Sequence, residues 1–265
     1  MFPLLVWGIV NGDDFVWKII LSVCSALSVY ELVKMLVPAL YSKVIGGDDS
    51  SSKHWIIFSC LGSVLLFNVF VQENHIFLQS VIPLFFTVMM LYGVFTAKKV
   101  ESSVVRLIGT VTGIVYGCLP WVSVWLLFKA SDGGKYLLFL IFVVMACDTG
   151  AYFGGKSFGK RKMSKNLSPN KTWEGLITGL VMASLVGVLT NYMFSGALGN
   201  YFVIALISFT GALAGVLGDL VESGFKRFSG VKDSGRVLPG HGGFLDRVDA
   251  ILFAAPVVWF LLLKA

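Results

Sequence analysis

The sequence predicts an all-α fold: a polytopic transmembrane helical bundle of eight to nine spans with a polar cavity facing the cytoplasm. Of 265 residues, 56% are hydrophobic and only 14% are charged, and the mean hydropathy is +0.82. Soluble domains usually carry about 25% charged residues. The apolar residues also fall in runs of about 20, which is the length that crosses a bilayer as a helix. The loops between these runs alternate in charge, as the loops of a protein with one fixed orientation do.

The expected spans follow one another closely along the chain. They cover residues 15–40, 55–72, 76–96, 104–128, 136–154, 173–194, 201–222 and 248–263. The shorter apolar stretch Phe2–Asn11 is expected to be a short first span or an interfacial helix. It has neither a positive n-region nor a small-residue cleavage site, so we do not interpret it as a signal peptide.

Charge in the loops gives an orientation. The loops at 41–54, 97–103, 155–172 and 223–247 hold most of the Lys and Arg, whereas those at 12–14, 73–75, 129–135 and 195–200 are acidic or nearly neutral. The positive-inside rule places the basic loops in the cytoplasm. We therefore expect a multi-pass protein of the cell inner membrane with its site facing the cytoplasm. The net charge of +6 then reflects contact with the lipid bilayer and not with nucleic acid.

Small residues in the spans are explained by packing. Cys24, Cys60, Cys118 and Cys147 lie in apolar runs without metal-ligand spacing, so we expect four core residues. The pairs Gly175/Gly179 and Gly211/Gly215 have the small-xxx-small spacing of close helix contacts.

The first unusual loop is rich in cations and glycine. Between Asp148 and Glu174 it has no acid and six cations: Lys156, Lys160, Arg161, Lys162, Lys165 and Lys171. A plain positive-inside loop would need fewer, and this pattern favours polyphosphate binding. Gly150 to Ser157 matches the Walker A pattern, but that motif needs a strand before it and a soluble α/β domain around it. We reject a P-loop here.

The second unusual loop is bounded by paired carboxylates. Asp219 and Glu222 share a helix face near the end of one span, and Asp246 and Asp249 repeat the spacing where the last span begins. Structural ion pairs with Lys226, Arg227 and Arg247 are one interpretation. The other is a hard divalent metal such as Mg²⁺, which binds carboxylates and bridges to phosphates.

A glycine-rich segment lies within this second loop. The backbone of Gly240 to Gly243 would approach phosphate closely, and His241 is either a phosphate donor or a structural hinge. Residue chemistry alone thus predicts a membrane enzyme that uses a polyphosphate ligand and a divalent metal at the cytoplasmic lipid interface.

At these residues the chain resembles the phosphatidate cytidylyltransferase (CDP-diacylglycerol synthase) family. The family signature has the form S-x-x-K-R-x4-K-D-x-G-x2-L-P-G-H-G-G-x-x-D-R-x-D, and Ser223 to Asp249 matches it at every fixed place. An upstream block shares Asp148, Ala151, Tyr152, Gly155, Phe158, Gly159, Ser168, Pro169, Lys171, Thr172, Glu174 and Gly175. Before about residue 140 the likeness is limited to length, the pattern of spans and Tyr30-Glu31-Leu32. Family members usually begin with a charged segment and a complete first span, whereas this sequence starts at Met1 inside an apolar stretch.

The resemblance implies a reaction of CTP with phosphatidic acid that gives CDP-diacylglycerol and pyrophosphate, for phospholipid biosynthesis. It implies that Asp219 and Asp246 hold Mg²⁺ with Glu222 and Asp249 in support, and the number of metals and a monovalent cation stay open. The implied phosphate-binding residues are Lys226, Arg227, Lys232, Arg236 and Arg247, with His241, Gly242 and Gly243; the upstream block adds Asp148, Tyr152, Lys171 and Glu174 to the cavity. Lys226 and Asp249 are also expected among the catalytic residues. Two interpretations of Glu31 stay open: its side chain snorkels to the membrane surface, or it lines the cavity.

We divide the chain into residues 1–140, a helical scaffold where homodimer contacts are expected, and 141–265, the catalytic region. Rival hypotheses are a CDP-archaeol synthase, a polyprenol kinase and, from another class, a transporter. The long signature argues against the first two. The crowding of charge at one membrane face, and not at the midplane, argues against a transporter. The pattern of CDP-alcohol phosphotransferases is absent from the sequence.

Overall fold

The computed structural model describes residues 12–47, 52–72, 75–96, 100–130, 134–164, 166–237, 240 and 242–264. The chain forms two compact units that are not contiguous in sequence. The first comprises Met1–Asp13, Ser123–Gly224 and Val248–Ala265, and the second comprises Asp14–Val122 and Phe225–Arg247. Each unit is described in turn.

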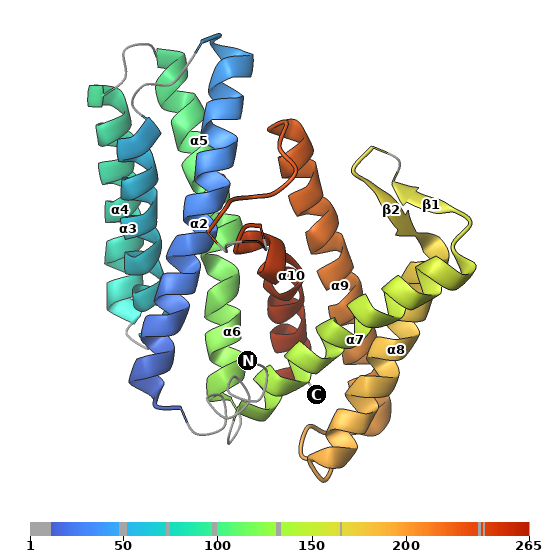
Figure 1. The fold of residues 1–265 in the computed structure, drawn as a ribbon. Coiled ribbons are helices and arrows are strands. Elements are labelled where there is room, and N and C mark those ends of the chain that lie inside the picture. Colours follow the sequence, from blue (N-terminus) through green and yellow to red (C-terminus); the bar gives the residue numbers. More distant parts are fainter. Residues whose placement is uncertain are drawn as a thin grey trace. The chain divides into compact units, whose positions relative to one another are not determined.

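The second unit is built on a cluster of long helices (Figure 1). These are α2 (Asp14–Val44), α3 (Ser52–Val71), α4 (His75–Thr96) and α5 (Val100–Gly117), and α2 packs against both α3 and α5. Three glycines spaced four residues apart in the second half of α5 explain the close contact with α2. A Cβ at Gly109 or Gly113 would overlap Val37 or Val33, and one at Gly117 would lie 3.0 Å from the Val29 nitrogen. Small residues at this spacing let two helix backbones approach.

The expected span at 104–128 consists of two helices. Helix α5 ends at Gly117 and α6 (Leu119–Lys129) begins directly after Cys118. Pro120 accounts for the interruption, because its ring excludes the carbonyl of a preceding turn and its nitrogen has no hydrogen to donate. Trp121 in the first turn of α6 donates its indole N–H to Ser28 Oγ at 3.1 Å, which ties this helix to α2.

The first unit contains helices α7 (Lys135–Phe158) and α8 (Trp173–Met193), joined by a short antiparallel hairpin of β1 (Lys162–Ser164) and β2 (Ser168–Thr172). The two helices pack through glycines. A Cβ at Gly175 or Gly179 would lie 2.8 Å from a backbone carbonyl of α7, and one at Gly154 would overlap Thr178. The Gly175/Gly179 packing face is therefore confirmed.

Helices α9 (Tyr201–Phe228) and α10 (Leu245–Leu262) meet through the second predicted glycine pair. A Cβ at Gly211 would overlap Val258, and one at Gly215 would lie 3.1 Å from the carbonyl of Ala250. One turn further, Gly218 faces Phe253, whose Cβ lies 2.7 Å from the ideal Cβ position. This close approach sets the spacing between the functional ends of the two helices.

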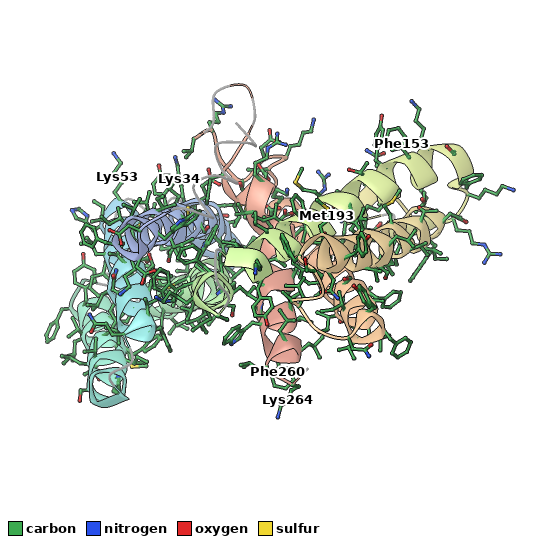
Figure 2. All side chains as sticks on the ribbon, turned by 90° about the horizontal axis from the view of Figure 1, so that it is seen from below. Lys34, Lys53, Phe153, Met193, Phe260 and Lys264 are labelled. Atoms are coloured by element: carbon green, nitrogen blue, oxygen red, sulfur yellow. The ribbon has the colours of Figure 1, made fainter. Side chains whose placement is uncertain are left out.

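All eight expected spans are helical, and the chain is a multi-pass membrane protein by length and composition. Six helical segments within the described ranges are long and apolar enough to cross a membrane, and the count of eight to nine stays a prediction. Large apolar side chains project outward from the helices of the first unit, as lipid-facing residues do (Figure 2). Phe153, Met193 and Phe260 are each at least 60% exposed.

Two local features concern the first cationic loop. Sequence reasoning expected an all-α fold, yet this loop contains the hairpin β1–β2, which the charge pattern gave no means of detecting. The Walker-like segment from Gly150 to Ser157 lies wholly within helix α7. A phosphate-binding loop needs a non-helical backbone that turns its N–H groups outward, so the rejection of a P-loop is confirmed.

Candidate functional site

Three of the four predicted metal-binding carboxylates meet in the first unit. Asp219 and Glu222 lie one turn apart on α9, and Asp249 lies in the second turn of α10. One oxygen from each of the three lies within 4.8 Å of the other two. Glu222 is fully buried and Asp249 is 8% exposed. The glycine contacts between α9 and α10 bring these carboxylates together, and we call them the carboxylate trio.

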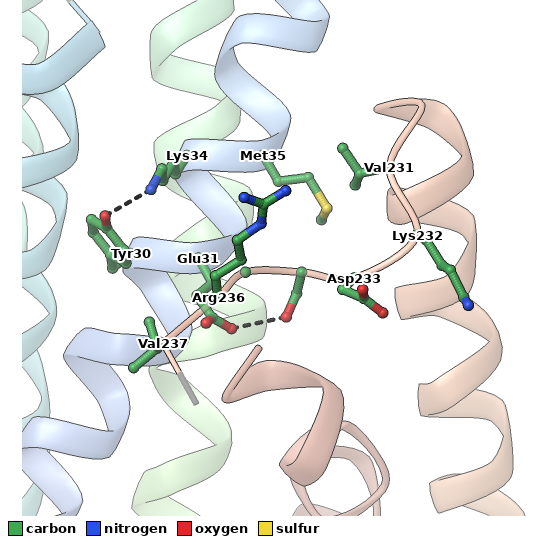
Figure 3. A pocket seen from close by; sticks show the side chains of 11 residues that line it. Tyr30, Glu31, Lys34, Met35, Val231, Lys232, Asp233, Arg236 and Val237 are labelled. Carbon is green, nitrogen blue, oxygen red and sulfur yellow. Dashed lines mark hydrogen bonds between the residues drawn. The ribbon is translucent and has the colours of Figure 1, made fainter. Parts of the chain in front are cut away.

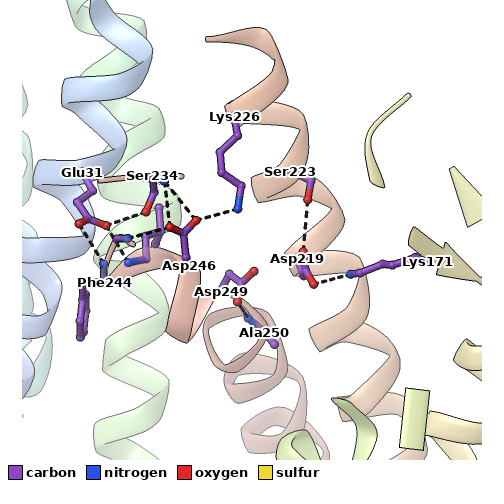
Figure 4. Close-up of polar contacts among 12 residues, drawn as sticks. Glu31, Lys171, Asp219, Ser223, Lys226, Ser234, Phe244, Asp246, Asp249 and Ala250 are labelled. Atoms are coloured by element: carbon purple, nitrogen blue, oxygen red, sulfur yellow. Dashed lines mark hydrogen bonds and ion pairs between the residues drawn. The ribbon is translucent and has the colours of Figure 1, made fainter. Parts of the chain in front are cut away.

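A cation from the hairpin is paired with the trio (Figure 4). Lys171 of β2 places its Nζ 2.6 Å from Asp219 Oδ2, and Ser223 donates to the other oxygen, Oδ1, at 3.4 Å. Asp148 of α7 lies close enough to Asp219 and Lys171 to interact with both charges. The structure thus brings the upstream block and the end of α9 to one place, which the sequence could only infer from resemblance.

The donor chemistry of the trio suits a divalent cation. Two carboxylates about 5 Å apart repel by about 3–4 kcal/mol at an effective dielectric constant of about 20. Burial of Glu222 and Asp249 keeps water from screening that repulsion. Hard oxygen donors at this spacing are the ligands that Mg²⁺ and Ca²⁺ take. The residues present therefore fit the metal that the sequence predicts.

Glu174 holds the cationic loop to the start of α8. Its carboxylate accepts hydrogen bonds from the backbone N–H groups of Lys160 and Arg161 at 3.1 Å. Thr172 caps α8 by accepting from the Gly175 N–H at 3.1 Å. An acid in the first turn also complements the helix dipole. Glu174 thus has a positioning contact in the structure, and its contact with substrate stays a prediction.

In the second unit, Asp246 binds the loop between α9 and α10, residues 229–244, which we call the signature loop. Its Oδ1 accepts from Lys226 Nζ at 2.8 Å, and its carboxylate also accepts from the backbone N–H groups of Ser234 and Gly243 at 3.0 and 2.9 Å. Asp246 and Lys226 are both largely buried, at 14% and 15% side-chain exposure. The ion pair that sequence analysis left as one alternative is present here, beside charge-assisted bonds to the backbone.

Glu31 of α2 joins the same network. It is 1% exposed and accepts from Ser234 Oγ at 2.8 Å and from the N–H groups of Phe244 and Leu245 at 3.0 and 2.8 Å (Figure 4). The alternative of a snorkelling side chain is therefore excluded. Sequence reasoning missed Ser234 entirely, because it occupies a variable place in the signature.

An open pocket of about 710 Å³ lies between α2 and the signature loop (Figure 3). The predicted phosphate ligands Lys232 and Arg236 line it together with Lys34, whose Nζ donates to Tyr30 Oη at 2.9 Å. Lys34 was not among the predicted residues, because one lysine near the end of a span is typical of any cytoplasmic helix end.

The other predicted residues are more dispersed. Tyr152 is 63% exposed on α7 and contacts the ring of Phe153. Arg227 and Arg247 are exposed on α9 and α10. Gly242 has a φ of +82°, which favours glycine, and the Gly243 N–H already donates to Asp246. His241 lies outside the described residues.

Comparison with known proteins places these features in a family. The family model described as "Cytidylyltransferase family" matches residues 1–264. The chain is similar to a protein named phosphatidate cytidylyltransferase from Staphylococcus haemolyticus (strain JCSC1435), 47% identical over 134 residues, 51% of each chain. A protein of the same name from Staphylococcus aureus (strain COL) is 47% identical over 135 residues, 51% of this chain and 52% of the relative. The match thus spans about half the length of these curated relatives. The match over nearly the whole sequence shows that the chain belongs to the cytidylyltransferase family.

Proposed function

We propose that this chain transfers a cytidylyl group from CTP to phosphatidic acid, giving CDP-diacylglycerol and pyrophosphate. The observation that carries the proposal is the carboxylate trio, with oxygens within 4.8 Å of one another and Lys171 bound to Asp219. The choice of CTP and phosphatidic acid as substrates is supported by family membership and by the names of the similar proteins. The apolar helices are consistent with a membrane protein, and a membrane contains the lipid acceptor.

The trio is the proposed Mg²⁺ site, formed by Asp219, Glu222 and Asp249. When bound, the ion would neutralise phosphate charge on the nucleotide and favour departure of pyrophosphate. Asp246, also predicted as a ligand, accepts from Lys226 and two backbone N–H groups. The trio is therefore the core of the proposed metal site, and a role for Asp246 as a further ligand stays a prediction. The number of ions stays open.

The reaction needs positioning and charge neutralisation more than covalent chemistry. A phosphate oxygen of the lipid attacks the α-phosphorus of CTP, a new P–O bond forms, and the bond to the β-phosphate oxygen breaks. Pyrophosphate leaves with the electron pair. No protein nucleophile is required. Lys171, held by Asp219, would offset charge next to the ion. In the second unit, Lys232 and Arg236 line the open pocket and are proposed, from the family resemblance, to bind phosphate oxygens.

We further propose that the protein lies in the cytoplasmic membrane with this site on the cytoplasmic side. The alternation of basic and neutral loops supports that orientation. A homodimer is proposed from the family resemblance. Light scattering tests the homodimer by giving the protein mass of the particle after the detergent is subtracted. A mass that equals one chain would contradict the homodimer.

The direct test uses purified protein in detergent or vesicles with CTP, phosphatidic acid and Mg²⁺, following CDP-lipid and pyrophosphate together. We expect equal amounts of both products and no turnover after chelation of the metal. An isoprenoid phosphate serves as the competing acceptor, because the rival lipid enzymes use isoprenoid substrates. Absence of CDP-lipid, or equal turnover of the two acceptors, contradicts the proposal.

A further inference from the structure

The signature loop is fastened to a helix that sequence analysis assigned to the scaffold. Glu31 on α2 binds Ser234 near the start of the loop and Phe244 and Leu245 at its end. These contacts join residues more than 200 positions apart in the chain, since Ser234 is 203 residues from Glu31. One buried carboxylate therefore closes the loop at both of its ends.

Two glycines of the signature make room for this carboxylate. A Cβ at Gly235 would overlap the carboxylate of Glu31. A Cβ at Gly243 would overlap Ser234 Oγ and lie 2.6 Å from Glu31 Oε2. Neither glycine has a positive φ, so backbone conformation does not require it. The space occupied by Glu31 requires glycine at position 235, and the space occupied by Ser234 and Glu31 requires it at position 243.

Ser234 links Glu31 to the ion pair of the loop. Its hydroxyl donates to Glu31 Oε2 at 2.8 Å, while its backbone N–H donates to Asp246 at 3.0 Å. Asp246 in turn accepts from Lys226 at 2.8 Å. Ser234 is 7% exposed, so both contacts are made in a largely water-free environment where hydrogen bonds to charged groups are strong.

We propose that Glu31 is a positioning residue for the signature loop. It acts through Ser234 and through the backbone at the start of α10, and through them it sets the placement of Asp246 and Lys226. Only the expected fall in kcat rests on the proposed function. The fastening of the loop itself is independent of which reaction the loop serves.

The Glu31→Gln variant tests the proposal with little change in shape. A glutamine keeps one acceptor oxygen, so in either orientation its NH2 group opposes at least one donor that Glu31 accepts: the Phe244 N–H at one end, or the Ser234 hydroxyl and the Leu245 N–H at the other. Glu101→Gln is the matched control, because Glu101 is an exposed acid in the first turn of α5. We expect at least a tenfold fall in kcat for Glu31→Gln and none for the control.

A double-mutant cycle separates positioning from general damage. Ser234→Ala alone should lower kcat, and in a Glu31→Ala background it should lower kcat little further, because Glu31→Ala already removes the acceptor of the Ser234 hydroxyl. Fully additive losses would overturn the proposed route through Ser234.

Limited trypsin digestion supplies a readout that needs no activity. Lys232 and Arg236 are exposed cleavage sites in the signature loop, and Lys160, Arg161 and Lys162 are exposed sites at the hairpin. For Glu31→Gln we expect at least tenfold faster cleavage in the signature loop and an unchanged rate at the hairpin. Equal acceleration at both places means global loosening and overturns the proposal, as does an unchanged rate at both.

The two readouts also separate this inference from the proposed function. If the wild-type protein makes no CDP-lipid, the proposed reaction fails while the digestion pattern still decides whether Glu31 fastens the loop. Should Glu31→Gln not fold, Ser234→Ala is the milder variant. It removes one of the three bonds to Glu31, and we expect a smaller but still loop-specific acceleration.

Discussion

At the scale of single residues, the site depends on how each carboxylate is partnered. Asp219 binds Lys171, while Glu222 and Asp249 are buried beside it. Asp246, one turn before Asp249 in the sequence, binds Lys226 and loop backbone. Sequence spacing treats the pairs Asp219/Glu222 and Asp246/Asp249 as equivalent, and their contacts show that they are not.

This difference decides which substitution tests the metal. Asp246→Asn would disturb the loop as well as any metal, so loss of activity in that variant has two explanations. Asp249→Asn removes charge from the trio and leaves the contacts of Asp246 with Lys226, Ser234 and Gly243 in place. We expect it to raise the Mg²⁺ concentration for half-maximal turnover by at least about tenfold, as the loss of a metal-supporting group does.

Thermal unfolding gives a second measurement for the same variant. Mg²⁺ that binds the folded protein raises the Tm in proportion to the logarithm of its concentration over Kd. We expect that rise for the wild type and for Glu101→Gln, and a much smaller rise for Asp249→Asn. An unchanged rise in Asp249→Asn would remove this residue from the metal site.

At the scale of helices, glycine contacts position the functional groups. The approach of α9 to α10 at Gly211, Gly215 and Gly218 precedes Asp219 directly, so the trio forms where the two helices are held closest. The contact of α7 with α8 supports the hairpin that carries Lys171. In a membrane such contacts depend on close packing, because lipid provides no hydrophobic drive for helices to associate.

Gly154→Ala tests the packing of α7 on α8. Its Cβ would overlap Thr178, and overpacking of this kind costs about 1–3 kcal/mol. Gly224→Ala is the control, since its Cβ would meet only Leu167 Cδ2 at an ordinary 3.7 Å. Replacing glycine by alanine stabilises a helix by about 0.5–1 kcal/mol in both variants. The difference between their free energies of unfolding therefore measures the cost of the overlap with Thr178.

We expect a lower Tm in detergent for Gly154→Ala and an equal or higher Tm for Gly224→Ala. Turnover should fall with the Tm only in Gly154→Ala, because α7 carries Asp148 and leads into the hairpin with Lys171. The same Tm in the two variants would show that α7 and α8 are not in close contact at this position.

At the scale of the whole molecule, the charge of the loops predicts which of them face the cytoplasm. The hairpin and the signature loop are basic, whereas the loop at 195–200 contains no charged residue. The four native cysteines lie within helices or between α5 and α6. Single cysteines placed in the loops can therefore report orientation against a low background.

Arg161→Cys and Val231→Cys probe the two basic loops, and Ala197→Cys probes the neutral one; all three positions are exposed. In intact cells, a membrane-impermeant maleimide should label Ala197→Cys and spare the other two. After permeabilisation it should label all three. Labelling of Val231→Cys in intact cells would place the signature loop outside and contradict the proposed cytoplasmic site.

The sequence alone predicts the membrane class, a helix at each expected span, and the packing faces at Gly175/Gly179 and Gly211/Gly215. These properties depend on composition and on spacing within one helix, so neighbouring residues suffice to reveal them. It also placed Asp219 and Glu222 on one helix face by their spacing. Resemblance then added the substrates and most of the basic residues of the site.

Which of these groups meet depends on how the helices pack. In the structure, Asp249 lies beside Asp219 and Glu222, Lys171 forms an ion pair with Asp219, and Glu31 contacts a loop some 200 residues away. The structure also contains the hairpin β1–β2, which the all-α expectation did not include. Hydropathy and charge patterns are local in sequence, whereas these contacts depend on how separate helices pack, and a buried carboxylate is stabilised by whichever distant donors that packing brings to it.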